Sequence, residues 1–269
     1  MIHIGTAGVP LGSPERDTNS GIRYVKKLGL DALEIEFVRN IYLDKKAAQE
    51  VGKTANESNV KLSIHAPYYI NLNSDEKEKI EASKKRILES ARIGLEAGVR
   101  IVVFHPGFYG KTSTKEETLA NIMKQMAEIR ETLDKEGNDI ILGPETTGKV
   151  SQFGTLDELI EIAKNIKGVL PAVDFGHMHA RFNGGLKSKQ DFQNVFDKFR
   201  NNFKQPMHIH MTGIKYSQKG ELEHLEIDSN EPDYRHFAEI LKEGRIDATV
   251  ISESPNIEAD ALKLKRMLS

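Results

Sequence analysis

Six side chains that are common metal ligands stand at the ends of six successive apolar segments of the chain. These residues are His65, His105, Glu145, Asp174, His210 and Glu253. The chain has no cysteine, so any bound metal must be held by histidine, aspartate and glutamate, which suit zinc and manganese. One such residue at the end of a strand is most often a cap or turn residue, but six in succession are hard to explain as turns. The pattern predicts a metal site built from residues far apart in the sequence.

The number of ligands indicates more than one ion. A catalytic zinc usually takes three protein ligands and keeps one position open for water, so six ligands point to two or three ions. Glu145 stands centrally in the series and is suited to bridge two ions, and we expect catalytic roles for Glu145 and Glu253. The three carboxylates would offset only part of the charge of two divalent ions, so the site should attract an anionic substrate although the formal net charge of the chain is −2.

Two further histidines extend this set. His177 comes directly after the sixth predicted strand, and His224 lies after the seventh, in a segment that we expect to be a loop. Alone, His224 would be a solvated loop residue, but beside His177 it becomes a candidate ligand for a third ion. Glu221 and Glu223 are close to His224 in the sequence and are further candidates.

The other histidines carry weaker expectations. His208 and His210 are two positions apart and therefore point to the same face of a strand. We expect His208 to be buried behind the ligands and to support them rather than to bind metal. His179 fits either a supporting or a surface position, and His3 and His236 have no companions in the pattern.

The elements that must position these residues alternate eight times between short apolar strands and longer helical segments. The predicted strands are Ile2–Gly5, Ala32–Phe37, Lys61–His65, Arg100–His105, Ile140–Glu145, Leu170–Asp174, Pro206–His210 and Thr249–Glu253. The run 101–104 is apolar on both faces, which is typical of parallel strands covered by helices. Capping boxes at 114–117 and 155–158 predict the starts of two helices, and a third helix should begin at Ser188.

This alternation predicts a (β/α)8 TIM barrel that forms a single α/β domain over residues 1–269. The length is close to the roughly 250 residues typical of such a barrel, and no Gly-x-Gly-x-x-Gly turn follows the first strand, as a doubly wound dinucleotide fold would require. In a barrel the carboxyl ends of all strands meet at one mouth, where the active sites of this fold are found. The six ligand-type residues should therefore share that mouth.

The composition of the chain limits the classes of protein to which it can belong and the places where we expect it to act. With 38% hydrophobic and 29% charged residues, the chain fits a globular domain, and a pI near 6.5 argues against binding nucleic acid mainly through bulk positive charge. No apolar run approaches the ~20 residues that cross a bilayer, and the N-terminal residues do not resemble a signal peptide. We expect a cytoplasmic protein without membrane association and without an obligate protein partner.

Several of these motifs together resemble the endonuclease IV family of apurinic/apyrimidinic endonucleases, within the xylose-isomerase-like TIM barrel superfamily. The motifs are Ser63-Ile64-His65-Ala66-Pro67-Tyr68-Tyr69-Ile70-Asn71-Leu72, His105-Pro106-Gly107, Pro144-Glu145-Thr146-Thr147-Gly148, Asp174-Phe175-Gly176-His177 and Glu253-Ser254-Pro255. They run from the third strand to the eighth. The first two are the most specific, because the wider superfamily shares the ligands of strands five to eight but not generally the histidine pair.

The resemblance implies three zinc ions, hydrolysis of the DNA phosphodiester 5′ to an abasic site in base excision repair, and damaged (abasic) double-stranded DNA as the partner. The implied ligands are His65, His105 and Glu145 for the first ion, Glu145, Asp174, His210 and Glu253 for the second, and His177 and His224 in part for the third. Tyr68 matches a family position that approaches the DNA, where an aromatic ring can fill the space left by a flipped-out nucleotide.

The chain departs from the family pattern in two places. The family holds its third ion with an Asp-x-His pair, whereas this chain has leucine two positions before His224, so that Glu221 or Glu223 must substitute or the third site is weak or absent. The loop after the second strand also lacks the family's DNA-penetrating arginine at its aligned place, which leaves Arg39 or Tyr42 as a replacement.

Two other functions remain open from the sequence. A divalent-metal sugar isomerase or epimerase of the same superfamily would hold one Mn²⁺ or Mg²⁺ with the ligands of strands five to eight, and Glu145 and Glu253 could then move a proton at a carbon next to a carbonyl. A barrel that binds DNA or a partner without turnover is the third reading.

Overall fold

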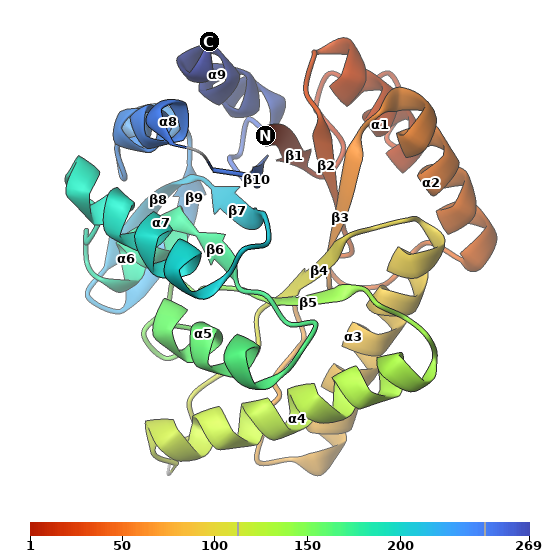
Figure 1. Cartoon of the computed structure of the whole chain (residues 1–269), viewed down its shortest axis with the longest axis vertical. Helices are drawn as coiled ribbons and strands as arrows, with labels where there is room; N and C mark the ends of the chain where they lie inside the picture. The colour runs from red at the N-terminus through yellow and green to blue at the C-terminus, as the bar shows by residue number, and fades with distance from the viewer. Residues whose placement is uncertain (112, 245) are drawn as a thin grey trace.

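Eight parallel strands form the centre of the molecule in the computed structural model, which describes residues 1–111, 113–244 and 246–269 (Figure 1). The strands are β1 (Ile2–Ala7), β2 (Ala32–Glu36), β3 (Lys61–His65), β4 (Ile101–Phe104), β5 (Ile141–Pro144), β6 (Ala172–Asp174), β7 (Met207–Met211) and β10 (Ala248–Ser252). Their order around the sheet is β5-β4-β3-β2-β1-β10-β7-β6. The predicted strands are present with boundaries shifted by a few residues.

The sheet closes between its two outer strands. Isolated parallel bridges join Leu142 to Val169 and Glu145 to Ala172, and the N–H of Thr146 donates to the carbonyl of Ala172 at 3.0 Å. These contacts link β5 to β6, which completes a barrel. The prediction of a (β/α)8 TIM barrel is confirmed.

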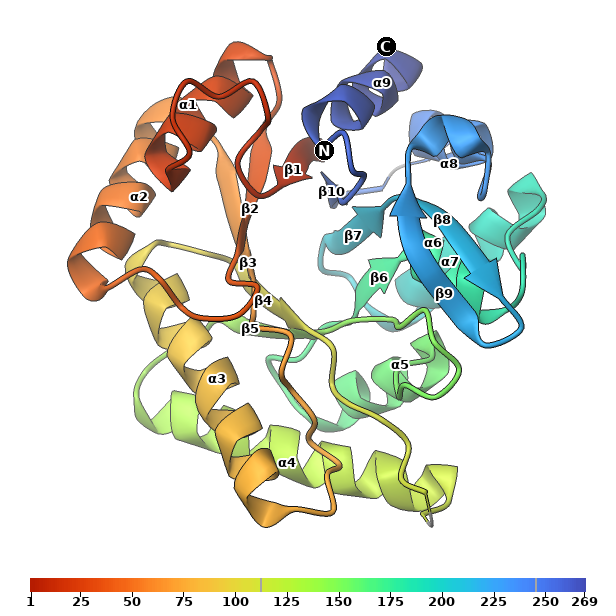
Figure 2. The ribbon, with the colours of Figure 1, turned by 180° about the vertical axis from the view of Figure 1, so that it is seen from behind.

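Helices surround the barrel on the outside (Figures 1 and 2). They are α1 (Thr18–Lys27), α2 (Lys45–Ser58), α3 (Lys77–Glu96), α4 (Lys115–Lys135), α5 (Leu156–Asn165), α6 (Phe175–Arg181), α7 (Lys189–Asn202), α8 (Tyr234–Glu243) and α9 (Glu258–Leu268), with a single 3-10 turn η1 (Ile227–Ser229). The predicted capping boxes are formed by Thr114 and Thr155, and Ser188 forms a third with Asp191. No helix in the described part of the chain is long and apolar enough to cross a membrane.

The strands present two different faces. Val102 and Phe104 of β4 belong to the large apolar core under the helices, whereas Ile101 and Val103 join Ala172 in a separate small cluster. Because neighbouring residues of a strand point to opposite faces, this smaller cluster lies inside the barrel. The interior therefore contains little apolar packing, and its other positions are available for polar side chains.

The segment that carries His224 was expected to be a loop, and this expectation is wrong. It forms an antiparallel hairpin of β8 (Gly213–Ser217) and β9 (Gly220–Leu225). Both faces of these two strands carry polar residues. The sequence therefore lacks the alternation of apolar and polar residues by which a strand is recognised. The hairpin lies in front of α6 and beside β6 and β7 (Figure 2), and the N–H of Glu221 donates to the carbonyl of Gly148 at 3.1 Å. It thus forms one wall of the mouth.

A buried carboxylate holds the turn that follows β10. Asp260, in the first turn of α9, is fully buried and accepts hydrogen bonds from the Ser254 hydroxyl at 2.6 Å and from the N–H of Ile227 at 2.7 Å. The amide of Asn256 donates to it at 3.1 Å, and the ammonium of Lys263 lies 2.9 Å away. Asp260 therefore connects the end of β10, η1 and α9.

Replacing Asp260 with alanine should lower the free energy of unfolding by roughly 2–4 kcal/mol, because buried donors would lose their charged acceptor. Asp228 offers a matched control, since it contacts the same lysine at 2.6 Å from an exposed position. Asp228→Ala should cost less than about 1 kcal/mol. Urea unfolding followed by circular dichroism measures both, and equal effects of the two variants would contradict this role of Asp260.

Candidate metal centre

Strand register brings the predicted ligands to the inner face of the barrel. Glu36 pairs with His65 between β2 and β3, and Asp174 pairs with His210 between β6 and β7. Partners in parallel strands point to the same face, which is the face that carries Val103, the partner of His65 on β4. His105, Glu145 and Glu253 each follow the last residue of their strand and complete the ring.

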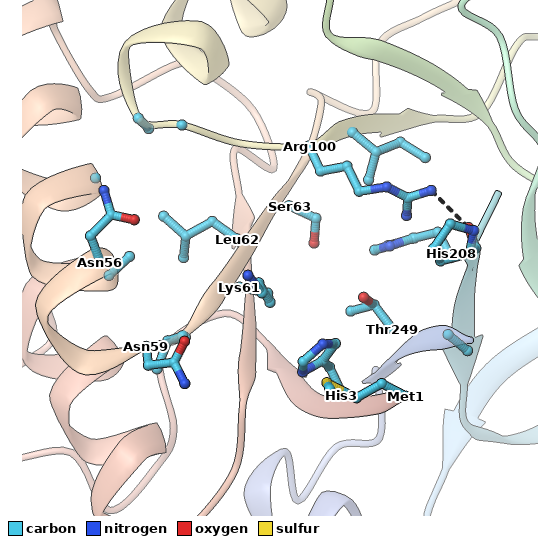
Figure 3. A pocket seen from close by; sticks show the side chains of 18 of the residues that line it. Met1, His3, Asn56, Asn59, Lys61, Leu62, Ser63, Arg100, His208 and Thr249 are labelled. Atoms are coloured by element: carbon cyan, nitrogen blue, oxygen red, sulfur yellow. Dashed lines mark hydrogen bonds between the residues drawn. The ribbon is translucent and has the colours of Figure 1, made fainter. Parts of the chain in front are cut away.

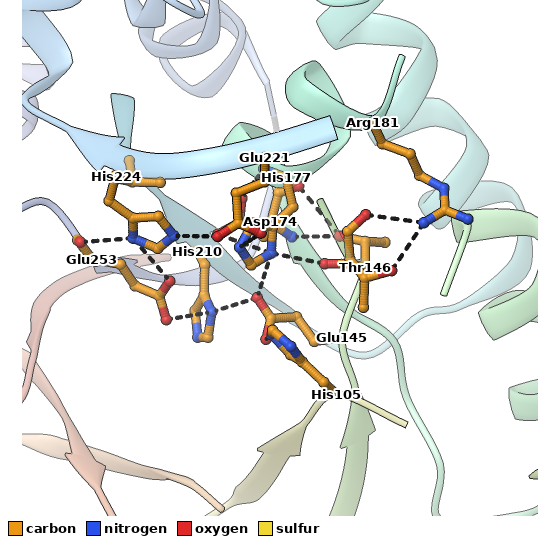
Figure 4. Close-up of polar contacts among 12 residues, drawn as sticks. His105, Glu145, Thr146, Asp174, His177, Arg181, His210, Glu221, His224 and Glu253 are labelled. Atoms are coloured by element: carbon orange, nitrogen blue, oxygen red, sulfur yellow. Dashed lines mark hydrogen bonds and ion pairs between the residues drawn. The ribbon is translucent and has the colours of Figure 1, made fainter. Parts of the chain in front are cut away.

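Glu145 lies at the centre of the site and directs its two oxygens to different histidines (Figure 4). Its Oε2 is 3.3 Å from Nε2 of His65 and 2.9 Å from Nε2 of His105. Its Oε1 is 3.0 Å from Nδ1 of His210 and 3.2 Å from Nδ1 of His177. A carboxylate placed in this way can bridge two cation positions about which separate ligand sets are arranged.

Two ligand groups meet at Glu145. His65, His105 and Glu145 have donor atoms that lie within 4.8 Å of one another, and so do Glu145, Asp174, His177 and Glu253. The Oε1 atom of Glu253 is also 3.0 Å from Nδ1 of His210. The described residues thus provide groups of three or more donors that could hold a metal ion on each side of Glu145.

The ring orientations fit cation binding. The Nδ1 atoms of His65, His177 and His224 face the backbone carbonyls of Ala66, Thr146 and Glu253 at 2.9, 3.0 and 3.2 Å. A carbonyl only accepts, so Nδ1 carries the hydrogen, and a neutral ring then directs the lone pair of Nε2 into the site. The buried Oδ2 of Asp174 has no hydrogen-bond donor among the described residues, which a cation ligand would explain.

The hairpin supplies Glu221 to the part of the site around His177. Its carboxylate oxygens lie 3.6 Å from Nε2 of His177 and 3.7 Å from Nε2 of His224 (Figure 4). Glu223, the other candidate, is exposed and contacts the Lys215 ammonium at 3.0 Å. A β-bulge at Leu222, between the pairs Lys215–Glu223 and Tyr216–Glu221, turns the two carboxylates to opposite faces of the hairpin. Of the two glutamates, Glu221 is therefore the one that lies beside the histidines.

Two glutamates inside the barrel were missed by the sequence analysis. Glu34 and Glu36 are successive inward positions of β2, and Glu34 is fully buried. Oε2 of Glu34 accepts from Nε2 of His208 at 2.8 Å, and its Oε1 lies 2.8 Å from Nε2 of His210. The signal was present in the run Leu33-Glu34-Ile35-Glu36, where two carboxylates alternate with buried aliphatic residues.

The remaining histidines take three kinds of position. His208 is buried behind His210 and held by Glu34, in the supporting place expected for it. His179 is also buried and contacts Glu231 at 2.7 Å, away from the mouth ligands. His3 stands at the amino end of β1, and His236 lies in α8.

The carboxylates of the site differ in their protonation. Burial would raise the pKa of Glu145, but the charges of His105 and His210 outweigh it and hold this pKa well below its ordinary value. The pKa of Glu253 falls to about 2, since His210 more than offsets the effect of burial. Burial dominates elsewhere, raising the pKa of Glu36 to about 8 and also raising the pKa of Asp174.

The pKa values of three buried histidines of this site are raised by the neighbouring charges. Burial would lower the pKa of His65, but its hydrogen bond to Glu145 and the charge of Glu36 raise this pKa to about 10. The pKa values of His177 and His210 lie well above the ordinary value, because neighbouring carboxylates again outweigh burial. Around this centre the carboxylates hold protons on imidazoles whenever no cation takes their place.

A cavity of about 410 Å³ opens over these residues. Its walls include Tyr68, His105, His224 and Pro255. The ring of Tyr68 lies 5.8 Å from that of His65, edge to face, while the residue as a whole remains 57% exposed. Tyr68 therefore lies between the candidate ligands and the surface around the mouth.

The loop after β2 runs beside Tyr68. The N–H of Tyr68 donates to the carbonyl of Val38 at 2.9 Å, and the next residue, Arg39, is exposed. Tyr42 packs edge-on against Phe37 at 5.4 Å, and its hydroxyl lies 3.3 Å from that of Thr18. Of the two candidates to replace the missing arginine, Arg39 is thus the less constrained.

Known proteins resemble this chain, two of those described here over nearly its whole length and one over about half of it. A family model described as xylose isomerase-like TIM barrel matches residues 22–269. An uncharacterized protein of Methanocaldococcus jannaschii is 36% identical over 270 residues, covering 99% of this chain and 96% of that protein. A probable endonuclease 4 of Aquifex aeolicus is 29% identical over 154 residues, which cover 56% of this chain and 54% of that protein. The crystal structure of a D-tagatose 3-epimerase-like protein superposes with a TM-score of 0.74 at 25% identity, covering 98% of this chain and 95% of that one.

Binding of Zn²⁺ or Mn²⁺ should release protons at pH 7, because His65, His177 and His210 have raised pKa values and must lose a proton to become ligands. Affinity should therefore rise between pH 6 and pH 8. Isothermal titration calorimetry in buffers of different ionisation enthalpy counts the protons. His3→Gln, at the opposite end of the barrel, should leave that count unchanged, and a count of zero for the unaltered chain would contradict the protonation described above.

Proposed function

The chain belongs to the xylose isomerase-like TIM barrel family, and on that premise we propose that it is a metal-dependent endonuclease that hydrolyses the DNA phosphodiester 5′ to an abasic site. The observation that carries the proposal is the double contact of Glu145. One of its oxygens faces His65 and His105, and the other faces His210 and His177. The histidine pair on β3 and after β4 adds a second cation position to the ligands of strands β5, β6, β7 and β10.

We assign the ligands as follows. One ion would be held by His65, His105 and Glu145, a second by Glu145, Asp174, His210 and Glu253, and a third by His177, His224 and Glu221. The nitrogen and oxygen donors favour Zn²⁺, with Mn²⁺ as the alternative. Ions at these places would supply positive charge for a phosphodiester and lower the pKa of a water molecule. Glu145 would fix the spacing of the ligand sets, and Glu253 would hold His210 in position.

The surface around the mouth supports DNA as the substrate. Tyr68 and Tyr69 after β3 and Phe108 after β4 are 57%, 62% and 42% exposed, so three accessible aromatic residues follow the strands that lead to His65 and His105, and Tyr68 lines the cavity itself. Exposed rings at a nuclease mouth can stack on bases or fill the space left by a displaced nucleotide. Arg39, on the loop bonded to Tyr68, would contact the DNA backbone.

A sugar epimerase is the second candidate. The similarity to the D-tagatose 3-epimerase-like structure, at 25% identity, favours it. In that function Glu145, Asp174, His210 and Glu253 would hold one ion, and Glu145 and Glu253 would exchange a proton with the substrate. Metal analysis separates the candidates, because about one ion per chain is expected of the epimerase and two or three of the nuclease.

Purified protein should incise a duplex that contains one abasic site, and a chelator should abolish the incision. His105→Ala should lower the rate at least about 100-fold, since loss of a direct ligand should cost no less than loss of the groups that orient ligands. Gel electrophoresis of end-labelled DNA provides the measurement. His236→Ala, outside the mouth, should retain the rate, and full activity of His105→Ala would refute the nuclease assignment.

Tyr68→Ala should weaken binding to the abasic duplex roughly tenfold while leaving the metal content unchanged, because the ring contacts DNA and not the ions. Tyr69→Ala provides the comparison, since Tyr69 is exposed but does not line the mouth cavity. Fluorescence anisotropy with labelled DNA measures both affinities. A larger loss of DNA affinity in Tyr69→Ala than in Tyr68→Ala would show that the DNA contact lies outside the cavity.

A further inference from the structure

We propose that the amino-terminal end of the barrel, opposite the metal centre, is a second binding site, which takes a small organic anion carrying a phosphate or carboxylate group. A cavity of about 450 Å³ opens there (Figure 3). This volume lies within the range of ordinary small-molecule sites. None of its lining residues lines the mouth cavity, so the proposal is independent of the function assigned above.

Strand register places one side of the cavity at the amino-terminal opening of the barrel, while its other side reaches Ala55 and Asn56 of α2, outside β3. Lys61 and Ser63 of β3 precede His65 on the same inward face, and His208 precedes His210 on β7. Thr249 of β10 pairs with His208 and also with His3 of β1. These side chains converge from four strands on the space between them, as Figure 3 shows.

The cavity carries two cations that are not neutralised. The Arg100 side chain is half-buried, and its guanidinium donates a hydrogen bond to the carbonyl of Pro206 at 2.7 Å, which fixes the group without offsetting its charge. Neither Arg100 nor Lys61 forms an ion pair with any residue that the structure describes. The carboxylate in the lining, Asp247, is engaged by the amino group of Met1. A concave surface with this surplus of positive charge favours an anion.

A buried hydroxyl supplies the second, independent observation. Ser63 is 3% exposed, lines the cavity, and its Oγ has no hydrogen-bond partner among the described residues. A buried hydroxyl without a partner is costly unless a ligand or water satisfies it. The hydroxyl of Thr249 lines the same space, so both hydroxyls can donate to an oxyanion held between Lys61 and Arg100 (Figure 3).

The rest of the lining defines the other part of the ligand. Ala55, Val60, Leu62 and Ile101 provide an apolar wall. A bare inorganic ion would fill only part of the volume. The chemistry therefore favours an organic phosphate or carboxylate whose carbon skeleton rests on the aliphatic wall.

Calorimetric titration of the intact, metal-loaded protein tests this site with inorganic phosphate, glycerol 3-phosphate and propionate as probes. Binding of at least one anion is expected, with affinity at least tenfold weaker in Lys61→Gln and Arg100→Gln and a few-fold weaker in Ser63→Ala. The order of the three anions distinguishes a phosphate ligand from a carboxylate ligand. Lys61 is exposed and Ser63→Ala removes a single unpaired atom, so these two variants test the site even where Arg100→Gln does not fold.

Lys53→Gln is the matched control, because this lysine of α2 lies outside the cavity and pairs with Glu57. It should bind the anion as the unaltered chain does. Phosphate bound at the metal centre would be insensitive to Lys61→Gln and Ser63→Ala, and that result would overturn the proposal. Absence of binding for all three anions would overturn it as well.

Discussion

The structure depends on ionisable groups that fill the inside of the barrel where a packed core would otherwise stand. Glu34, Glu145 and Asp174 are fully buried, and carboxylates in that position are tolerated only when a cation or hydrogen bonds compensate for lost hydration. In this chain the compensation comes from imidazoles. The charges of His105 and His210 hold the pKa of Glu145 low, and the hydrogen bond between His65 and Glu145 helps to raise the pKa of His65 to about 10. A divalent ion bound by these residues would replace the protons on the imidazoles, so metal binding and barrel stability are expected to be linked.

The surrounding elements serve to hold these charges in place. Thr146, just after β5, donates to the carbonyl of Ala172, accepts from the N–H of Asp174 on β6, and accepts a hydrogen bond from His177 through its own carbonyl. The hairpin β8–β9 brings Glu221 and His224 over the mouth, and its attachment at Gly148 keeps them there. Asp260 holds the turn after Glu253 through its hydrogen bond from the Ser254 hydroxyl. Each of these supports comes from a different part of the chain, which explains how ligands so distant in sequence remain in register.

Relatives in this family are named for chemistry as different as that of an endonuclease and of a sugar epimerase. The four candidate ligands on or after β5, β6, β7 and β10 would suit either chemistry, because one divalent ion can polarise a phosphoryl or a carbonyl oxygen. What separates the two functions in this chain is the addition made by His65 and His105 on one side of Glu145. The bridge at Glu145 is for that reason more informative than the overall shape of the barrel.

The sequence by itself determined the barrel, because apolar runs alternating with capped helices allow few other folds, and it identified the ligand types at the strand ends, because a chain without cysteine offers few other metal ligands. Only the tertiary structure decided which residues meet. Glu221 rather than Glu223 faces His224 because a β-bulge at Leu222 turns the two glutamates to opposite faces of the hairpin. Strand β9 was not predicted, since polar residues on both of its faces hide the period of two. Glu34 lies within an aliphatic strand and was not predicted as part of the site. Its partners His208 and His210 are 174 and 176 positions away in the sequence. Contacts over such separations depend on the register between strands, which local sequence does not encode.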